Sequence, residues 1–240
     1  MKLYVDTHTH TVASTHAYST IQENARAAAD RGLKILAITD HAPAIDDSPH
    51  KLHFMGYHAL EKSFFGVQML YGAELNILDY DGSLDLDESI YKRLDICIAS
   101  FHDCVVTPGS RKENTRAMVK AMQQKYVAIL GHPDDGKIPV DYEELVLEAK
   151  SAGVLLEVNN ASLKNAFYRV NARENIITML KLCEKHGVMV SIGTDAHAAG
   201  AVGNMDNAVA LMEEIGFPEE LVINAYPEAF IRHLENKNKT

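Results

Sequence analysis

The feature that most constrains the fold is a sevenfold alternation of short apolar runs with amphipathic helical stretches. The runs are rich in β-branched residues and span residues 2–8, 34–41, 67–75, 95–102, 127–133, 153–160 and 188–197. Repeated strand–helix units of this kind form a parallel sheet, in which each strand is buried on both faces. The pattern therefore predicts an α/β fold built around one parallel sheet.

Capping signals between the apolar runs mark where helices begin and end. Thr20 and Glu23 have the spacing of a capping box, and Gly32 and Gly187 stand where the preceding helices should stop. Helices are therefore expected over residues 20–31, 54–65, 112–125, 141–152, 172–186, 204–215 and 218–235. The polar tail at residues 235–240 is expected to fray.

Length and charge limit the domain organisation and the partners. The chain has 240 residues without a linker, a length that single α/β barrels routinely reach, so we expect one barrel domain over residues 1–240. The net charge of -10 disfavours long nucleic acid as a partner, because phosphate backbones are bound through a surplus of Lys and Arg.

Cysteine use and the N-terminal residues bear on the compartment. Cys97, Cys104 and Cys183 form no C-x-x-C pair, which favours a reducing compartment, and we interpret all three as buried small side chains. Asp6 comes too early for the apolar region of a signal peptide, and no apolar run approaches membrane-spanning length. We therefore expect a cytoplasmic protein that makes no use of a membrane.

Nearly every predicted strand ends in a side chain that can bind a metal ion. These side chains are His8, His10, His41, Glu74, His102, His132, Asp195 and His197, and His16 follows in the first loop. Parallel barrels have their active sites at the carboxyl ends of the strands, so the nine side chains are expected to converge. A single histidine of this kind is more simply explained as a hydrogen-bonded structural residue. A buried set of nine, however, would cost about 1–3 kcal/mol for each group left without a partner, and a metal centre satisfies them together.

The remaining histidines have simpler explanations. His186 lies at a helix C-terminus, where its charge favours the helix dipole, and His233 on the last helix is also interpreted as structural. His50, His53 and His58 lie in or beside the segment APAIDDSPHKLHF. This segment is interpreted as a solvated loop, with a lid or a wall of the substrate pocket as the alternative.

The motifs DTHTH, TDH, YGAEL, SFH, GHP and TDAH resemble those of the PHP (polymerase and histidinol phosphatase) superfamily, and within it the YcdX-like probable phosphatases. The resemblance covers essentially the entire chain, and all nine expected ligand positions hold the expected residue types. It implies a distorted seven-stranded (βα)7 barrel of the TIM-like type, with three Zn²⁺ ions per chain at the C-terminal ends of the strands.

The resemblance also implies how the ligands are shared among the ions. The first ion would be held by His8, His10, Glu74 and Asp195. Glu74 would bridge to the second ion, which His102 and His132 also bind, and the third ion would take His16, His41 and His197. Chemically, seven imidazoles and two carboxylates suit Zn²⁺, with Mn²⁺, Fe²⁺ or Co²⁺ as alternatives, and suit Mg²⁺ or Ca²⁺ poorly.

Several residues beside the ligands are candidates for supporting roles. Asp6 and Asp40 are expected to accept hydrogen bonds from ligand imidazoles, with strand-end capping or solvation as the alternative. Candidate phosphate contacts outside the metal ions are Arg111 or Lys112 and Asn160 or Lys164, which are otherwise interpreted as solvated.

These inferences point to a metal-dependent phosphatase that acts on a small phosphorylated substrate. Three divalent ions carry about +6, and two carboxylates and a bridging hydroxide leave about +3, which would attract a phosphate dianion to an acidic chain. We expect the bridging hydroxide to attack phosphorus in line, with Glu74 and Asp195 as the residues required for catalysis.

The sequence is compatible with three alternatives. Amidohydrolases also begin with His-x-His and end with an Asp, but they commonly use a bridging lysine where this chain has Glu74. A non-catalytic metal-binding regulatory module and a phosphodiesterase or nuclease are the other two. A homo-oligomer is compatible with the sequence, although no surface feature demands one.

Overall fold

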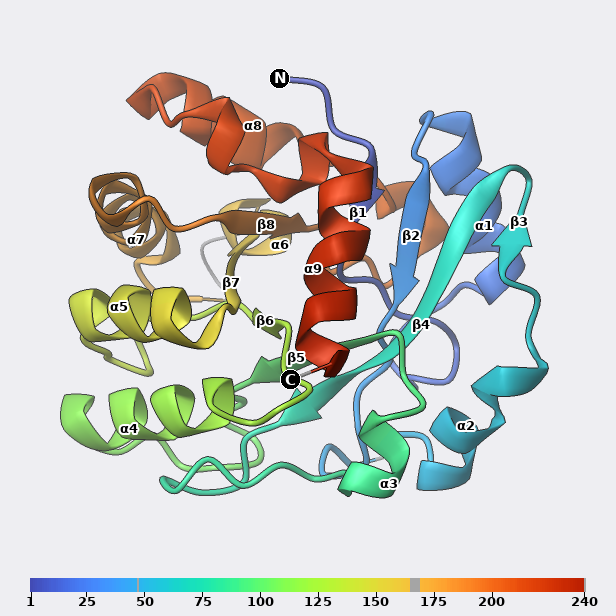
Figure 1. Cartoon of the computed structure of the whole chain (residues 1–240). Helices are drawn as coiled ribbons and strands as arrows, with labels where there is room; N and C mark the ends of the chain where they lie inside the picture. The colour runs from blue at the N-terminus through green and yellow to red at the C-terminus, as the bar shows by residue number, and fades with distance from the viewer. Residues whose placement is uncertain (47, 165–168, 240) are drawn as a thin grey trace.

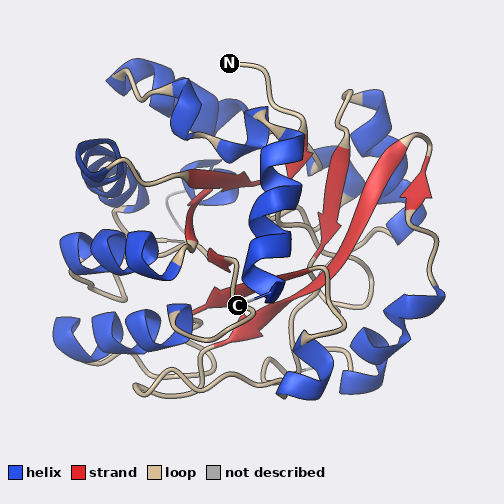
Figure 2. Ribbon diagram, in the orientation of Figure 1, coloured by secondary structure: helices blue, strands red, loops and turns tan. Residues whose placement is uncertain are grey.

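Seven parallel strands form a nearly closed barrel surrounded by helices (Figures 1 and 2). The computed structural model describes residues 1–46, 48–164 and 169–239. The parallel strands pair in the order β1-β2-β4-β5-β6-β7-β8. Their bounds are Val5–Asp6 (β1), Ile35–Ile38 (β2), Val67–Asn76 (β4), Ile96–Ser100 (β5), Ile129–Leu130 (β6), Leu155–Asn159 (β7) and Val190–Gly193 (β8). The predicted seven-stranded α/β barrel is confirmed.

The helices follow most of the predicted segments. The α-helices are Ile21–Asp30 (α1), Lys51–Met55 (α2), Glu88–Tyr91 (α3), Arg111–Met122 (α4), Tyr142–Ala152 (α5), Asn160–Lys164 (α6), Ala172–His186 (α7), Asp206–Ile215 (α8) and Pro227–Lys239 (α9). Short 3₁₀ helices span Gly56–Ala59 (η1), Ala199–Ala201 (η2), Glu219–Leu221 (η3) and Ile223–Ala225 (η4). The capping box of Thr20 and Glu23 forms at α1, and Gly187 ends α7 in the left-handed conformation with φ 64°.

The predicted helix over 54–65 is wrong. Helix α2 begins earlier, at Lys51, and the chain then turns into β3 (Ser63–Phe64), which pairs antiparallel with β4. Phe65 and Gly66 connect the two strands with φ of 52° and 81°, the conformation of a tight hairpin turn with both central residues at positive φ. An aromatic residue rarely adopts this conformation, so no sequence pattern marked the hairpin.

The predicted helix over 218–235 is also divided. Residues 219–225 form η3 and η4, and α9 starts only at Pro227. Proline lacks the backbone N–H and clashes with a preceding helical turn, so it is tolerated at the first position of a helix and not in its interior. Helix α9 then continues to Lys239, so residues 235–239 of the expected frayed tail are helical.

Alternate residues of the strands line the barrel interior, and their polarity changes along each strand. In β7, Leu155 belongs to the apolar cluster inside the barrel, whereas Glu157 and Asn159, two and four residues further on, are fully buried polar residues. Since side chains two apart point to the same face of a strand, the interior is apolar at the amino ends and polar at the carboxyl ends. This gradient brings the polar side chains of the strands together at one end.

The ring closes between β8 and β1 through a side chain from the far end of the chain. Asn224 in η4 donates to the carbonyls of Val5 and Ile192 at 2.8 and 2.7 Å and accepts from the Ile192 N–H at 2.7 Å. Towards the carboxyl ends the two strands meet directly, because Thr9 and Ala196 form a parallel bridge. Asn224 therefore takes the place of ladder pairing where β1 and β8 are apart.

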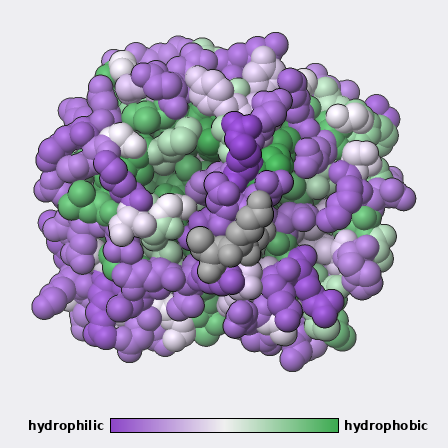
Figure 3. All heavy atoms as spheres, viewed as in Figure 1, coloured by the Kyte–Doolittle hydropathy of each residue, from purple (hydrophilic) through white to green (hydrophobic). Residues whose placement is uncertain are grey.

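Helix α9 covers the amino end of the barrel, and it lies in front of the strands in Figures 1 and 2. Its Phe230 and Leu234 are buried against Ile96, Ala128 and Leu155 at the starts of three strands. Hydrophilic residues cover much of this face of the molecule (Figure 3). Among the described residues, none of the helices combines the length and apolarity that crossing a membrane requires.

Candidate metal centre

All nine side chains expected to bind metal converge at the carboxyl ends of the strands, around Glu74 of β4. The Oε1 atom of Glu74 lies 2.8 Å from His132 Nε2 and 3.2 Å from His102 Nε2. The Oε2 atom lies 2.6 Å from His41 Nδ1, 3.4 Å from His8 Nε2 and 3.6 Å from His10 Nε2. The two oxygens of one buried carboxylate therefore face two different groups of imidazoles.

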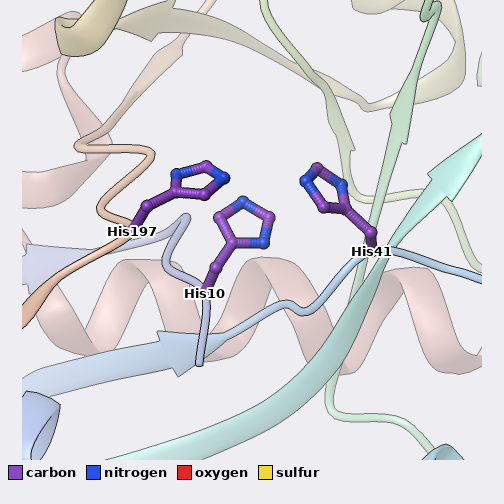
Figure 4. A group of neighbouring side chains, drawn as sticks. All are labelled: His10, His41 and His197. Atoms are coloured by element: carbon purple, nitrogen blue, oxygen red, sulfur yellow. The ribbon is translucent and has the colours of Figure 1, made fainter. Parts of the chain in front are cut away.

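The other expected ligands lie on the outer side of this group. Asp195 Oδ1 is 3.1 Å from His10 Nε2 and 3.6 Å from His197 Nδ1. The imidazole of His16 lies with its Nε2 3.2 Å from His41 Nε2 and stacks on His197 with ring centroids 4.6 Å apart. His10, His41 and His197 each offer a nitrogen within 4.8 Å of the other two, and their rings face a common space (Figure 4).

His41 lies within reach of two groups of possible ligands. Its ring is within reach of His10 and His197, but it also forms a compact group with Glu74 and His102. His8, His10 and Glu74 form a further group of this kind. The nine residues are thus placed together, while their assignment to individual ions stays a proposal.

Two of the expected ligands are held in unusual backbone conformations. His132 has φ 25° and Asp195 has φ 53°, values that cost residues with a side chain about 1–3 kcal/mol. The N–H of Asp195 donates to the His8 carbonyl at 2.9 Å, and the N–H of His132 donates to Glu157 Oε2 at 2.8 Å. Hydrogen bonds from the neighbouring strands therefore hold both residues where their side chains point into the cluster.

The cluster keeps its carboxylates ionised despite burial. Burial alone would raise the pKa of Glu74, but the imidazoles of His8 and His102 hold it well below its usual range. Burial would likewise raise the pKa of Asp195, which His8 and His10 hold well below its usual range. The cluster therefore offers two anionic ligands at neutral pH.

The pKa values of the imidazoles are shifted in different directions. Burial and the neighbouring His41 lower the pKa of His10 to about 3, and burial also lowers the pKa of His132 and His16. The pKa of His8 is raised, because its carboxylate neighbours outweigh the effect of burial. His10, His16 and His132 are thus neutral, the form in which imidazole binds metal.

The expected supporting roles of Asp6 and Asp40 are wrong in their details. Asp6 accepts from the N–H and hydroxyl of Thr194, and Asp40 accepts from Thr11 and Ser14. Neither hydrogen-bonds to an expected ligand imidazole within the described residues. Both carboxylates accept hydrogen bonds from backbone N–H groups and hydroxyls at the strand ends, so the alternative of strand-end capping applies.

Glu157 and Asn76 support the imidazoles instead. His8 Nδ1 donates to Glu157 Oε1 at 2.8 Å, and His102 Nδ1 donates to Asn76 Oδ1 at 2.7 Å. Sequence reasoning missed both residues, although each had a signal. Glu157 is the one charged residue in the apolar run GVLLEVNN, and Asn76 lies two residues after Glu74 and so on the same face of β4.

A cavity of about 990 Å³ opens over the cluster. The expected ligands His16, His41, Glu74, His102, His132, Asp195 and His197 line it. Phe101 and Ile138 add apolar wall, and Lys137, Lys164 and Arg169 add positive charge. The cavity therefore combines a metal-binding floor with cationic and apolar walls.

Arg169 is the cation nearest the cluster, and it was not predicted. Its guanidinium donates to Asn159 Oδ1 at 3.2 Å and to Ser162 Oγ at 2.7 Å, and it lies 3.4 Å from Asp195 Oδ2. The residue follows α6 outside any periodic pattern, so the sequence carried no signal for it.

Two of the four candidate phosphate contacts line the cavity, and two do not. Asn160 and Lys164 line the cavity, whereas Arg111 and Lys112, exposed at the start of α4, do not. Asn160 is also engaged by the backbone, since its Oδ1 accepts from the Ala208 N–H at 3.0 Å. Lys164 is exposed, so its side chain stands at the rim rather than the floor.

The segment APAIDDSPHKLHF includes the start of α2, and its Ile45 lines the cavity, in line with the alternative that part of the segment forms a wall of the pocket. His50 caps α2, and His53 lies beside Tyr57 and Asp40; neither these two nor His58 lines the cavity. Cys97 and Cys183 are buried as expected. Cys104 is exposed and lines the cavity, so the interpretation of all three cysteines as buried is wrong for this residue.

The donor set fits bound metal ions. His8 Nε2 is buried and makes no hydrogen bond within the described residues, although it lies 3.4 Å from Glu74 Oε2 and 3.8 Å from Asp195 Oδ1. Leaving such groups unsatisfied costs about 1–3 kcal/mol each, and coordination to a cation removes that cost. The nitrogen-rich set is the one that Zn²⁺ and similar ions prefer.

Comparisons with known proteins agree with this arrangement. A family model described as PHP domain matches residues 6–195. The chain is 44% identical over 239 residues to a probable phosphatase of Clostridium novyi, covering 100% of this chain and 97% of the relative. It is 40% identical over 239 residues to a probable phosphatase of Acetivibrio thermocellus, covering 100% of this chain and 98% of the relative.

The fold is also similar to that of a solved structure. This is histidinol phosphate phosphatase from Lactococcus lactis, determined in complex with zinc, L-histidinol and phosphate. The TM-score is 0.62 at 16% sequence identity, and the match covers 90% of this chain and 94% of the other.

Proposed function

The chain belongs to the PHP domain family, and on that premise we propose that it is a metal-dependent phosphatase that hydrolyses small phosphomonoesters at a trinuclear zinc site. The family and the names of the relatives support phosphatase chemistry. The zinc reported for the Lactococcus lactis enzyme supports the choice of metal.

The observation that carries the proposal is the position of Glu74 between two groups of imidazoles. Its Oε1 faces His102 and His132, and its Oε2 faces His8 and His10. A carboxylate placed in this way would be shared by two cations, one held also by His102 and His132 and the other by His8 and His10. His16 and His197 extend the donor set to a third position beside His41.

Zinc ions bound at these positions would lower the pKa of water to near neutrality, supplying a hydroxide nucleophile, and would add positive charge for the phosphate. The chain's own contribution is to hold neutral imidazoles and ionised carboxylates in place before substrate arrives. Burial keeps His10 neutral, and the surrounding imidazoles keep Glu74 and Asp195 ionised.

Arg169 would orient the phosphate from the protein side. Its guanidinium is fixed by Asn159 and Ser162 and lines the cavity above the cluster. A planar guanidinium matches two phosphate oxygens, so it would select the phosphoryl group and hold it over the metal-binding floor. The remaining wall, which includes Phe101 and Ile138, would hold the organic part of the ester.

Metal analysis combined with a substrate panel tests the proposal. The purified protein is expected to hold about three zinc equivalents and to hydrolyse phosphomonoesters. In Glu74→Ala, both metal content and turnover should fall, turnover by more than about 100-fold, because the shared carboxylate is lost. Glu143→Ala, which removes an exposed carboxylate on α5, is the matched control.

Each other outcome of this experiment has a definite meaning. Unchanged metal content and turnover in Glu74→Ala would contradict the bridging role. Hydrolysis of amides or lactams without phosphoester hydrolysis would favour an amidohydrolase. Metal-loaded protein that is inert on all these substrates would favour a binding module, and exclusive hydrolysis of phosphodiesters would replace the phosphomonoester assignment.

A further inference from the structure

Glu157 of β7 lies fully buried behind the candidate ligands and contacts two of them. Its Oε1 accepts from His8 Nδ1 at 2.8 Å, and its Oε2 accepts from the backbone N–H of His132 at 2.8 Å. Asn159 adds a donor to Oε2 at 3.2 Å. Glu157 of β7 thus links the segments that follow β1 and β6.

The first contact determines which nitrogen of His8 carries hydrogen. A carboxylate accepts and cannot donate, so it keeps the proton on Nδ1. In the neutral imidazole that binds metal, the lone pair is then on Nε2, which lies 3.4 Å from Glu74 Oε2. A carboxylate behind a metal-binding imidazole fixes the ring in this way and makes the nitrogen a better ligand.

The second contact fixes the backbone of His132. This residue has φ 25°, an unfavourable value for a residue with a side chain, and its N–H is bonded to Glu157. The same conformation places His132 Nε2 2.8 Å from Glu74 Oε1. The Glu157 carboxylate therefore contacts His8, which lies near Glu74 Oε2, and His132, which lies near Glu74 Oε1.

Gly193 of β8 provides a second, independent observation. A Cβ atom at this position would lie 2.0 Å from Glu157 Oε1 and 2.6 Å from His8 Cβ. Both distances are far below van der Waals contact, so only glycine permits the Glu157–His8 pair at its present separation. The neighbouring strand is therefore shaped around this pair.

We propose that Glu157 is a positioning residue that sets the tautomer of His8 and the backbone of His132 together, so that a single carboxylate organises two adjacent metal positions. The inference rests on the proposed metal centre. Glu157 itself need not bind metal or substrate.

The substitution Glu157→Gln tests the inference with little change of shape. If the new amide oxygen accepts from the His132 N–H, the amide nitrogen faces His8 Nδ1 and donates to it. The proton of His8 then moves to Nε2, where it blocks coordination. We expect zinc affinity at two of the positions to fall about 10- to 100-fold, as is typical for loss of such a partner, while the position near His16 and His197 keeps its affinity. Competition with a chromophoric chelator measures the three affinities.

Two further variants separate positioning from general destabilisation. Gly193→Ala changes no polar group but displaces the Glu157–His8 pair, and it should weaken zinc binding in the same way. Asp95→Asn is the control. Asp95 lies just before β5, is partly buried and accepts a hydrogen bond from the Tyr71 N–H, so the variant also exchanges a carboxylate for an amide. It should bind zinc like the wild type.

Nuclear magnetic resonance of the wild-type protein gives a readout that needs no folded variant. In zinc-loaded protein labelled with ¹⁵N-histidine, His8 should show a protonated Nδ1 and a metal-bound Nε2. The opposite tautomer would overturn the inference, as would wild-type zinc affinity in Glu157→Gln. Wild-type protein that binds no metal would instead overturn the proposed function itself.

Discussion

Glu74 and Glu157 are both buried glutamates on barrel strands, yet their surroundings give them different tasks. Burial by itself raises the pKa of each carboxyl, and the neighbouring His8 contributes to holding each below its ordinary value. The oxygens of Glu74 face the coordinating nitrogens of imidazoles, whereas those of Glu157 accept an imidazole N–H and a backbone N–H. Under the proposed function, the same residue type would serve as a ligand in one place and as the support of a ligand in the other.

Arg169 allows the phosphate-binding part of the proposed function to be tested apart from the metal. Arg169→Lys keeps the charge but loses the planar fork, so kcat/KM for a phosphomonoester should fall about 10- to 100-fold, mainly through KM. Steady-state kinetics and metal analysis on the same preparation check this. Metal content should not change.

The matched control is Arg173→Lys, because Arg173 pairs with Glu214 on the exposed surface. Unchanged kcat/KM in Arg169→Lys would remove Arg169 from the substrate site. A loss of bound zinc would instead assign it to supporting Asp195.

The convergence of the nine expected metal ligands was predictable because each lies at the end of a recognisable strand or in the first loop. The supporting residues were less so. Glu157 and Asn76 are identifiable only when the inward face of each strand is known, since alternate residues then share a direction. Asp6 and Asp40 lie next to ligands in the chain, but their side chains turn to hydroxyls and backbone N–H groups at the strand ends.

At the level of elements, long periodic segments were predictable and short irregular ones were not. All seven parallel strands appear at their predicted positions, with β4 ending one residue beyond its predicted range, because continuous β-branched runs bury both faces. The β3–β4 hairpin escaped prediction because Phe65 takes a positive φ. The four-residue α3 and five-residue α6 are too short to show a helical period.

Helix α9 is expected to stabilise the barrel without taking part in catalysis. Phe230 is fully buried under the amino ends of the strands, so Phe230→Ala should lower the free energy of unfolding by about 3–5 kcal/mol through lost burial and the resulting cavity. Urea unfolding monitored by circular dichroism measures this change.

Arg232→Ala is the control on the same helix, because Arg232 is exposed. Metal content and kcat of folded Phe230→Ala should match the wild type. A change in unfolding free energy below about 1 kcal/mol would show that α9 does not fill the base of the barrel.

For the whole molecule, the closing of the ring is the feature that local patterns miss. The strands β1 and β8 lie about 185 residues apart in the chain, as the contact of His10 with Asp195 illustrates. Asn224, a single polar residue beyond the last strand, joins them at the base. No sequence period marks such a residue, so the sequence predicts the strands but not how the first and last are joined.

Metal binding should make the stability of the whole molecule depend on pH. Burial lowers the pKa of His8 and His41, but nearby carboxylates outweigh it, so in the metal-free protein both pKa values lie above the ordinary 6.5. Because protons bind His8 and His41 more tightly in the folded than in the unfolded chain, they stabilise the metal-free fold below a pH of about 6.5. This stabilisation is lost as the pH rises through the pKa values of the two residues in the folded protein. Protons also compete with metal for the same nitrogens, so metal affinity falls as the pH drops.

The difference in melting temperature between zinc-loaded and metal-free protein should therefore widen from about pH 5 to about pH 8. Thermal unfolding before and after chelation measures it, with metal analysis after dialysis at each pH. Retention of every ion well below the free imidazole pKa of about 6.5 would contradict a centre with seven histidine ligands.

The joining of β1 and β8 by Asn224 has a consequence for folding during synthesis. A ribosome synthesises the chain from its amino end, so the segment bearing His8 and His10 emerges before the other expected ligands, while Asn224 lies 219 residues beyond its bonding partner Val5. Contacts of such wide separation form late, because a long loop of chain has to be closed before they are gained. The earliest donors to be synthesised are thus among the last to reach their final neighbours.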